Sequence, residues 1–344
     1  MRGTEVALFD YASHNKTILG NNSVIFHPAN SQHNDPQAIE KFSRRFEVIA
    51  YQDRSELDPL LEKKSIDLLY AIKSGKKDGL LSKKVPTMVH AVFPTSPSQV
   101  HGASFAFVSE WLSEQCSDNR IPCVPHIVWL PDDNTDLRAS LSIPPTALVL
   151  GSYGGRDSFD IAYATRAVRN LLSQRSDFYF VAMNLAPFIQ HPRAIFLPGS
   201  MDMDYKTQFI NSCDAMLHAR RQGESFGLAC GEFSVRNKPV ISYLHAKHKH
   251  HHLVLGDKGM YYADSDSLES MLLDLQPALI KAQDWDCYTQ RYNPERVMDL
   301  FDRHLIHPAA GLAGAKPLSP GYAAQWAYLK LKLAMRLNRF RPQV

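Results

Sequence analysis

The stretch of residues 213–243, CDAMLHARRQGESFGLACGEFSVRNKPVISY, constrains the fold more than any other part of the chain. Residues 214–218 are a short apolar run, which is typical of a buried strand. A polar loop follows, then a helical pattern from about Gly227 and a second apolar run at residues 239–243. The stretch therefore predicts a strand, a loop, a helix and a further strand, in that order.

The loop and helix of this stretch carry two carboxylates, Glu224 and Glu232, separated by seven residues. Gly227 lies between them and lets the backbone approach a ligand closely. The first N–H groups of a helix have no intrahelical acceptor and can bind an anion. A ligand that carries both phosphate and several hydroxyls suits this combination, and a nucleotide sugar is such a ligand.

The segment GESFGLACGEFSVRNKPVIS resembles the donor-binding signature of family-four retaining glycosyltransferases, whose pattern is E-G-F-G-L-x-x-x-E with a following P-V-I strand. Ser225 stands where the family has its first glycine. The resemblance implies that Glu224 contacts the transferred sugar and that Glu232 binds the ribose. It also implies that a short backbone segment lies beside the sugar and phosphates: Phe226, Gly227 and Leu228. The alternative is an ordinary amphipathic helix with two solvated glutamates.

The same resemblance implies the GT-B fold, an α/β architecture of two Rossmann-like doubly wound domains facing a cleft, with a C-terminal crossover helix. The 344 residues are enough for two such domains. We expect an acceptor-side domain over residues 1–135, a nucleotide-sugar domain over 146–310, and a helix at 322–344 that packs back on the first domain. Residues 131–145, polar and bounded by prolines, resemble a linker.

The composition gives no support to several other classes of protein. The net charge of +3 gives no reason to expect nucleic acid as a partner. No run of 18 apolar residues predicts a membrane span, and no secretion signal is visible. The five cysteines are scattered and odd in number, which is typical of reduced thiols in a cytoplasmic protein.

The first domain alternates apolar runs with helical patterns, which predicts a mainly parallel sheet. Its expected strands are residues 5–9, 23–26, 46–50, 66–72, 87–92, 104–108 and 126–129. Ligands bind beyond the carboxyl ends of such strands, so two positions are candidates. One is the loop expected at residues 10–22. The other is His90, which resembles the histidine that many retaining GT-B enzymes place against the donor sugar; the alternative is a core histidine.

The second domain is expected to open with a strand at residues 146–150, a glycine-rich turn and a helix from about Ser158. Gly154 and Gly155 in this turn suit phosphate. Family-four enzymes place an arginine here and a lysine four residues later; Arg156 matches, but Asp160 occupies the lysine position. A second phosphate cation must then come from elsewhere, and the candidates are Arg220, Arg221 and Lys249.

Three further features bear on ligand binding. Order along the chain places Asn184 and Leu197 where GT-B enzymes enclose the nucleobase. Asp202 and Asp204 form a D-x-D pair, which we interpret as helix capping and not as a metal site. The histidines at 245, 248 and 250–252 lack a partner cysteine or carboxylate, so we expect a loop and strand near the phosphates and no metal site.

The tail, residues 322–344, holds five basic residues and no acid. Trp326, Leu329, Leu333 and Leu337 recur at three- and four-residue steps and form an apolar stripe. We expect this stripe to pack on the first domain. The alternative is a basic amphipathic helix that makes peripheral contact with an anionic membrane.

The sequence thus predicts a retaining, metal-independent glycosyltransferase that uses a UDP- or GDP-sugar as co-substrate, needs no further cofactor, and acts on a glycan, glycolipid or other hydroxyl acceptor. The resemblance assigns the catalytic groups to Glu224, His90 and Arg156. Two other classes stay open: a nucleotide-sugar epimerase on the same fold, and a non-catalytic nucleotide- or carbohydrate-binding module.

Overall fold

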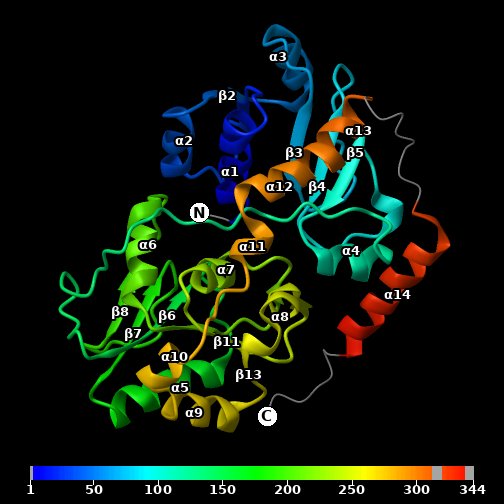
Figure 1. Ribbon diagram of the computed structural model, residues 1–344. Helices are drawn as coiled ribbons and strands as arrows, with labels where there is room; N and C mark the ends of the chain where they lie inside the picture. Colours follow the sequence, from blue (N-terminus) through cyan, green and yellow to red (C-terminus); the bar gives the residue numbers. More distant parts are fainter. Residues whose placement is uncertain (1–2, 312–319, 338–344) are drawn as a thin grey trace. The chain divides into compact units, whose positions relative to one another are not determined.

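The computed structural model describes residues 3–311 and 320–337 and divides them into two compact units (Figure 1). The first unit contains residues 3–127, 292–311 and 320–337, and the second contains residues 128–291. Residues 312–319 of the expected connector and 338–344 of the tail lie outside the described residues.

The first unit is built on short parallel strands. β1 (Val24–Pro28) pairs with β2 (Glu47–Tyr51), and a separate sheet has the order β3 (Leu69–Lys73), β4 (Thr87–Ala91), β5 (Ser104–Phe107). The helices that accompany these strands are α2 (Pro36–Ser43), α3 (Leu57–Lys63) and α4 (Glu110–Ser117). These strands lie at or beside the predicted positions.

Three predictions for the first unit are wrong. Residues 5–9 are not a strand, because they belong to helix α1 (Gly3–Thr17), and the loop expected at 10–22 is mostly the rest of this helix. The apolar run continues as buried residues at helical spacing, Val6, Ala7 and Tyr11, and the Tyr11 hydroxyl donates to the Pro125 carbonyl at 2.7 Å. A short apolar run does not distinguish a strand from a helix turn. Residues 126–129 form no strand either.

The chain after Arg291 belongs to the first unit, so the second unit ends before the expected boundary at residue 310. Helix α12 (Pro294–Phe301) continues into a π-helical turn and α13 (His307–Ala309). The Phe301 ring stacks on Tyr11, with ring centroids 5.0 Å apart, and Ser104 donates to the Leu305 carbonyl at 2.8 Å. Aromatic packing and this buried hydrogen bond therefore hold the segment in the first unit.

The second unit contains a six-stranded parallel sheet of order β13-β11-β9-β6-β7-β8. The chain starts in the middle with β6, runs outward through β7 and β8, and returns to β9 beside β6 before continuing to β11 and β13. The strand bounds are β6 Leu148–Tyr153, β7 Phe178–Met183, β8 Ala194–Leu197, β9 Ala215–His218, β11 Val240–Tyr243 and β13 Met260–Tyr262. This is a doubly wound order, as predicted.

Helices cover both faces of this sheet (Figure 1). One face packs on α5 (Ala162–Gln174) and α9 (Ser265–Leu273), with a core that includes Leu150, Phe180 and Leu217. On the other face lie α6 (Met203–Ser212) and α7 (Leu228–Val235), where Phe233 packs edge-to-face on Phe209. A Cβ at Gly151 would lie 3.0 Å from the Phe233 ring, so this glycine allows α7 to approach β6 closely.

The segment expected to be a linker, residues 131–145, contains no helix or strand and belongs to the second unit. Arg138 forms an ion pair with Asp214 (2.8 Å) and donates to the Ser212 carbonyl (2.9 Å). Arg138 therefore anchors the segment to the second unit.

Candidate functional site

The strand order of the second unit identifies one preferred ligand position. The order reverses between β6 and β9, and ligands of doubly wound sheets bind beyond the carboxyl ends of the strands at such a switch point. The glycine turn follows β6, and the loop that carries Glu224 follows β9. The Asp160 N–H donates to the Ala219 carbonyl (3.0 Å), and Asp160 Oδ1 accepts from the Arg221 N–H (2.7 Å). These bonds join the two loops, and they give Asp160 a structural use at the position where the family has lysine.

The glycine turn is open and carries an exposed arginine, Arg156, followed by an exposed aspartate, Asp157. A Cβ at Gly154 would lie 2.3 Å from the Ser158 hydroxyl, whereas a Cβ at Gly155 would meet no atom within 4 Å. Arg156 is exposed, and its guanidinium makes no hydrogen bond or ion pair with the residues that the structure describes. The following helix begins at Ala162, later than the predicted Ser158. A phosphate therefore has access to both the turn and the Arg156 side chain.

Asn184 joins the carboxyl ends of three neighbouring strands. Its backbone has φ of 59°, its Nδ2 donates to the Gly154 carbonyl at 2.8 Å, and its N–H donates to the Leu197 carbonyl at 3.0 Å. Gly199 approaches the same side chain so closely that a Cβ would lie 2.7 Å from Oδ1. The structure thus brings Gly154, Asn184 and Leu197 together.

Glu224 lies on a short strand, β10 (Gly223–Glu224), that pairs with β12 (His248–Lys249). Its Oε1 accepts from His218 Nε2 at 3.1 Å and from the Arg220 guanidinium at 2.8 Å. Burial alone would raise the pKa of Glu224, but the His218 hydrogen bond and the charge of Arg220 outweigh it and lower the pKa. Glu224 is therefore an oriented, ionised carboxylate at neutral pH.

A chain of hydrogen bonds continues behind Glu224. His218 Nδ1 lies 3.1 Å from the Ser242 hydroxyl, which lies 2.9 Å from His251 Nε2. An ionised carboxylate only accepts, so His218 Nε2 donates to Glu224, and Nδ1 of the same ring accepts from the Ser242 hydroxyl. Burial lowers the pKa of His251 well below its usual value, so the neutral His251 ring donates through Nε2 to Ser242. Each contact in the chain then has one donor and one acceptor.

Residues 226–228 combine a buried ring with a left-handed glycine. Phe226 is buried and stacks on the His250 ring, with centroids 5.1 Å apart. Gly227 has φ of 95° and precedes α7, which begins at Leu228 as predicted. A Cβ at Gly227 would lie 3.2 Å from both Glu224 and His251, so no larger residue fits there without displacing them. The Phe226 ring is therefore not available to a ligand.

Glu232 has a different environment from the one predicted. Its Oε1 accepts from Lys206 Nζ at 2.5 Å, and the two side chains are only 4% and 3% exposed. Lys206 Nζ also lies 5.7 Å from the ring centroid of Tyr153, the last residue of β6. The second oxygen, Oε2, is buried and has no hydrogen-bond partner in the described part of the chain. At most one Glu232 oxygen is therefore available to a ligand, not the two that simultaneous binding of both ribose hydroxyls would use.

The three candidates for a second phosphate cation differ. Arg220 is paired with Glu224, so that carboxylate already offsets its charge. Arg221 is tied to Asp160 through its backbone N–H, which holds it beside the exit of the glycine turn. Lys249 is the strand partner of Glu224 in the β10–β12 ladder. Arg220 and Arg221 lie on the loop after β9, and Lys249 lies on β12, which pairs with β10.

His90 lies in the first unit and is fully buried. Its Nδ1 is 2.8 Å from the Tyr70 hydroxyl, and its Nε2 is 2.7 Å from the Val124 carbonyl. Burial lowers the pKa of His90 to about 4, so the ring is neutral. Both ring nitrogens therefore bond to protein groups, which favours the core-histidine alternative over a contact with sugar.

The D-x-D pair and the histidines have structural uses. The Asp202 side chain accepts from the Asp204 and Tyr205 N–H groups and caps α6, as predicted. Three of the histidines form helix α8 (His250–Leu255), not the expected loop, and burial lowers the pKa of His250 to about 3. No group of three or more His, Cys, Asp or Glu side chains in residues 3–311 and 320–337 is arranged to hold a metal ion.

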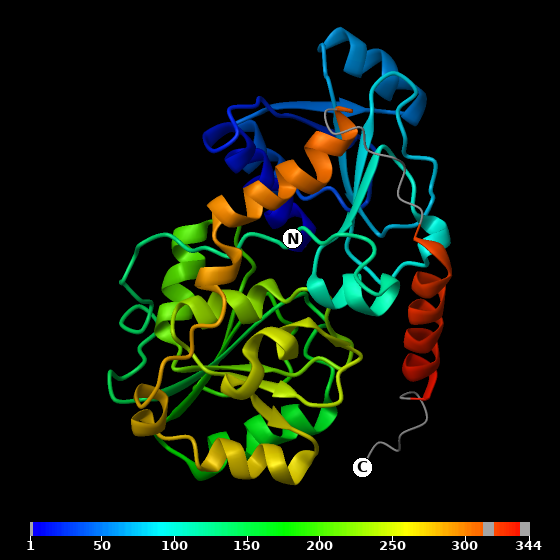
Figure 2. The same cartoon turned by 45° about the vertical axis from the view of Figure 1, so that its right-hand side comes forward.

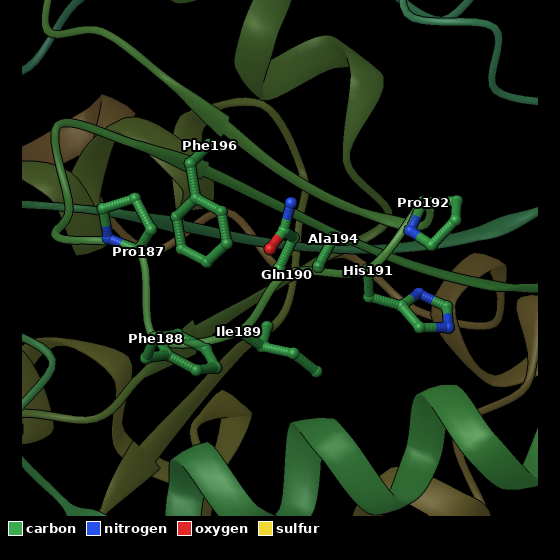
Figure 3. A pocket seen from close by; sticks show the side chains of 8 residues that line it. All are labelled: Pro187, Phe188, Ile189, Gln190, His191, Pro192, Ala194 and Phe196. Carbon is green, nitrogen blue, oxygen red and sulfur yellow. The ribbon is translucent and has the colours of Figure 1, made fainter.

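An open hollow in the second unit lies outside this residue set (Figure 3). Its wall is the segment that precedes β8, together with part of β8 itself. The lining residues are Pro187, Phe188, Ile189, Gln190, His191, Pro192, Ala194 and Phe196. None of the predicted donor-binding residues lines the hollow, so we do not assign it to the donor.

Comparison with known proteins identifies the fold. No protein-family model matches the chain, and a comparison with curated protein sequences finds no match. Among solved structures, a glycosyltransferase from Rickettsia africae has 11% identity and a TM-score of 0.60, over 98% of this chain and 93% of that one. Anabaena HepE in complex with UDP and glucose has 15% identity and a TM-score of 0.61, over 88% and 95%. MnaA of S. aureus with UDP has 12% identity and a TM-score of 0.59, over 92% and 96%. The chain therefore has the GT-B fold, with two Rossmann-like units.

Sequence reasoning missed Lys206, His218 and Ser242, and it named His251 only as one of a histidine cluster near the phosphates. Lys206 is one polar residue in a helical pattern, and nothing nearby signals that its ammonium is buried. His218 gave a usable signal, because a polar residue at the carboxyl end of a strand lies where ligands bind. The contacts of Ser242 depend on the pairing of β11 with β9 and on the position of α8, which no local pattern reveals.

Proposed function

We propose that this chain is a retaining glycosyltransferase that moves a sugar from a UDP- or GDP-sugar to a hydroxyl acceptor of a glycan or glycolipid. The observation that carries the proposal is the meeting of two loops at the β6–β9 switch point. One supplies the unpaired, exposed Arg156 and the other supplies the oriented carboxylate of Glu224. An anion-binding turn beside a fixed carboxylate suits a ligand with a diphosphate and a polyhydroxylated sugar.

In this proposal the diphosphate lies on Gly154 and Gly155, with Arg156 and the N-terminus of α7 facing its charge. These groups stabilise the leaving diphosphate as the anomeric carbon develops oxocarbenium character, an electrostatic contribution of about 3–4 kcal/mol for one well-placed donor. Glu224 accepts from sugar hydroxyls and fixes the orientation of the ring. Glu232 accepts one ribose hydroxyl through Oε2.

The resemblance to family-four enzymes supports the stereochemical outcome. It implies attack from the same face as the departing diphosphate, which takes the acceptor proton, so no protein nucleophile is assigned. We also propose that no metal takes part. The ligands named for HepE and MnaA make a uridine nucleotide the first donor to test. The five free thiols support a reducing compartment such as the cytoplasm.

A panel of nucleotide sugars, together with variants of Glu224 and Arg156, tests this proposal. UDP-glucose, UDP-N-acetylglucosamine, GDP-mannose and the free diphosphates are screened by thermal shift, and slow release of nucleotide diphosphate is then followed by chromatography. Glu224→Gln should keep diphosphate binding and lose most of the turnover. Arg166→Ala, which removes an exposed arginine on α5, serves as the control for Arg156→Ala.

Three outcomes would contradict the proposal. Interconversion of intact nucleotide sugars would identify an epimerase. Binding of nucleotide sugars without release of diphosphate, even with a range of glycan acceptors, would identify a binding module. Equal activity of Glu224→Gln and the unmodified chain would remove the carboxylate from the reaction.

A further inference from the structure

Helix α14 (Gly321–Leu337) has two opposite faces. One face packs on α4 through Ala324 and Leu331, which are buried and seven residues apart. The other face exposes large apolar side chains whose exposed fractions run from 47% at Leu329 to 85% at Tyr322. The exposed set is Tyr322, Trp326, Leu329, Leu333 and Leu337. The apolar stripe that we expected to pack on the first unit is therefore exposed. Figure 2 shows the backbone of α14 in red.

The spacing of the exposed residues makes this face continuous. Steps of four, three, four and four residues, at about 100° per residue, confine the five side chains to an arc of about 80°. Ala324 and Leu331 fall roughly opposite the centre of this arc by the same count. Five large apolar side chains in one line are more than the single exposed residues that a surface normally carries.

The charges beside the stripe are all positive. Lys330 lies on one side of the arc, and Lys332 and Arg336 lie on the other. All three side chains are exposed, and α14 contains no acidic residue. In the sequence no Asp or Glu follows Asp302. The partner of this face should therefore be both apolar and anionic.

We propose that α14 docks on an anionic phospholipid surface, in the plane of the interface, with its apolar stripe among the acyl chains and its basic residues at the headgroups. Amphipathic helices with basic flanks and Trp or Leu on the apolar face bind membranes in this way. The helix has 17 residues, and no described helix is long and apolar enough to cross a membrane. A second copy of the chain fits less well, because two such faces would bring together six like charges.

Charge and apolar area make separable contributions. A basic residue near an anionic surface changes the partition coefficient about fivefold, so removing three should lower binding roughly a hundredfold. Removing the Trp326 and Leu333 side chains should lower binding to all vesicles, because the buried apolar area falls. Neither group contributes to the proposed donor site, so the proposal is independent of the proposed function.

The test uses the full chain and flotation with two kinds of vesicle, phosphatidylcholine alone and phosphatidylcholine with 30% phosphatidylglycerol. We expect binding to the second kind, a roughly hundredfold loss in Lys330→Gln/Lys332→Gln/Arg336→Gln, and a loss in Trp326→Gln/Leu333→Gln. Leu279→Gln, which removes an equally exposed leucine on α10 (Pro277–Lys281), should bind as the unmodified chain does.

Several results would overturn the proposal. One is a lack of binding to anionic vesicles, and another is binding that both multiple variants retain. Equal binding to both kinds of vesicle would remove the anionic surface as the partner. Light scattering is run in parallel: a concentration-dependent dimer that Trp326→Gln/Leu333→Gln abolishes, with no vesicle binding, would show that a second copy covers the stripe. Melting curves of each variant, compared with Leu279→Gln, exclude loss of folding as the cause.

Discussion

Replacing Lys206 by methionine should destabilise the second unit strongly. Lys206 and Glu232 form an ion pair at 2.5 Å with side chains only 3% and 4% exposed. Methionine keeps most of the volume of lysine and removes its charge, so the Glu232 carboxylate stays buried without a counter-ion. Breaking one partner of a buried pair typically costs about 3–5 kcal/mol. For a unit of this size, 1 kcal/mol moves the melting temperature by about 2–4 °C, so we expect a fall of about 6–20 °C.

The double variant Lys206→Met/Glu232→Leu shows whether the uncompensated charge is the cause. Replacement of both partners by apolar residues is often neutral or stabilising, because no buried charge remains. The double variant should therefore recover most of the melting temperature that Lys206→Met loses. It should also bind nucleotide diphosphate weakly, since the proposed ribose acceptor is absent. The double variant should therefore have a higher melting temperature than Lys206→Met but bind nucleotide diphosphate more weakly than the unmodified chain.

The assay is differential scanning calorimetry of the full chain, with urea unfolding at 25 °C as a second measurement. Lys258→Met is the matched control, because Lys258 pairs with Asp284 at 3.0 Å but the side chains are 39% and 70% exposed. An exposed pair contributes about 0–1 kcal/mol, so this control should stay near the unmodified protein. Equal melting temperatures for Lys206→Met and Lys258→Met would refute the reasoning. So would a double variant less stable than Lys206→Met.

Three further predictions concern the proposed reaction. Arg156→Ala should weaken nucleotide diphosphate and intact donor alike, about 10- to 150-fold by calorimetry, because a charge-assisted hydrogen bond contributes about 1.5–3 kcal/mol; unchanged affinity would place the phosphates elsewhere. His218→Ala removes a hydrogen bond that lowers the pKa of Glu224, so the acidic limb of kcat/KM should move to higher pH. Ser242→Ala leaves that bond in place and should keep the original profile. Activity should survive EDTA; loss that manganese alone restores would show that a metal takes part.

The sheet of the second unit was predictable from the sequence because its strands are short apolar runs with clear boundaries. Apolar runs bounded by glycine, proline or aspartate favour strands, and β6, β9 and β11 begin within two residues of the predicted positions. The α7 start at Leu228 followed from the same logic. Helix α1 was not predictable in this way, because the apolar run at residues 5–9 has no glycine or proline after it to separate a strand from a helix turn.

The side-chain partners of the site residues could not be predicted from the sequence. Sequence order places Arg156 and Glu224 at one edge of a parallel sheet, because both follow strands that end there. It does not show that Arg220 bonds to Glu224, or that Lys206 from α6 reaches Glu232 on α7. Such pairs depend on which helices lie side by side and on the side-chain rotamers, and neither leaves a periodic trace in the sequence.

The charges on the glycine turn after β6 and on the loop after β9 determine how the proposed donor site meets the charge of a diphosphate. Arg220 is offset by Glu224, and Asp160 brings a negative charge to the position where family-four enzymes have lysine. In the proposed complex, Arg156 is the one guanidinium of the glycine turn, and the diphosphate brings at least two negative charges. The rest of that charge falls to the candidate cations Arg221 and Lys249 and to backbone N–H groups at Gly155 and at the start of α7, which are dipoles and not ions. Salt screens a single exposed cation strongly, so the affinity for bare diphosphate should fall steeply between 50 and 500 mM salt in the unmodified chain, and much less in Arg156→Ala.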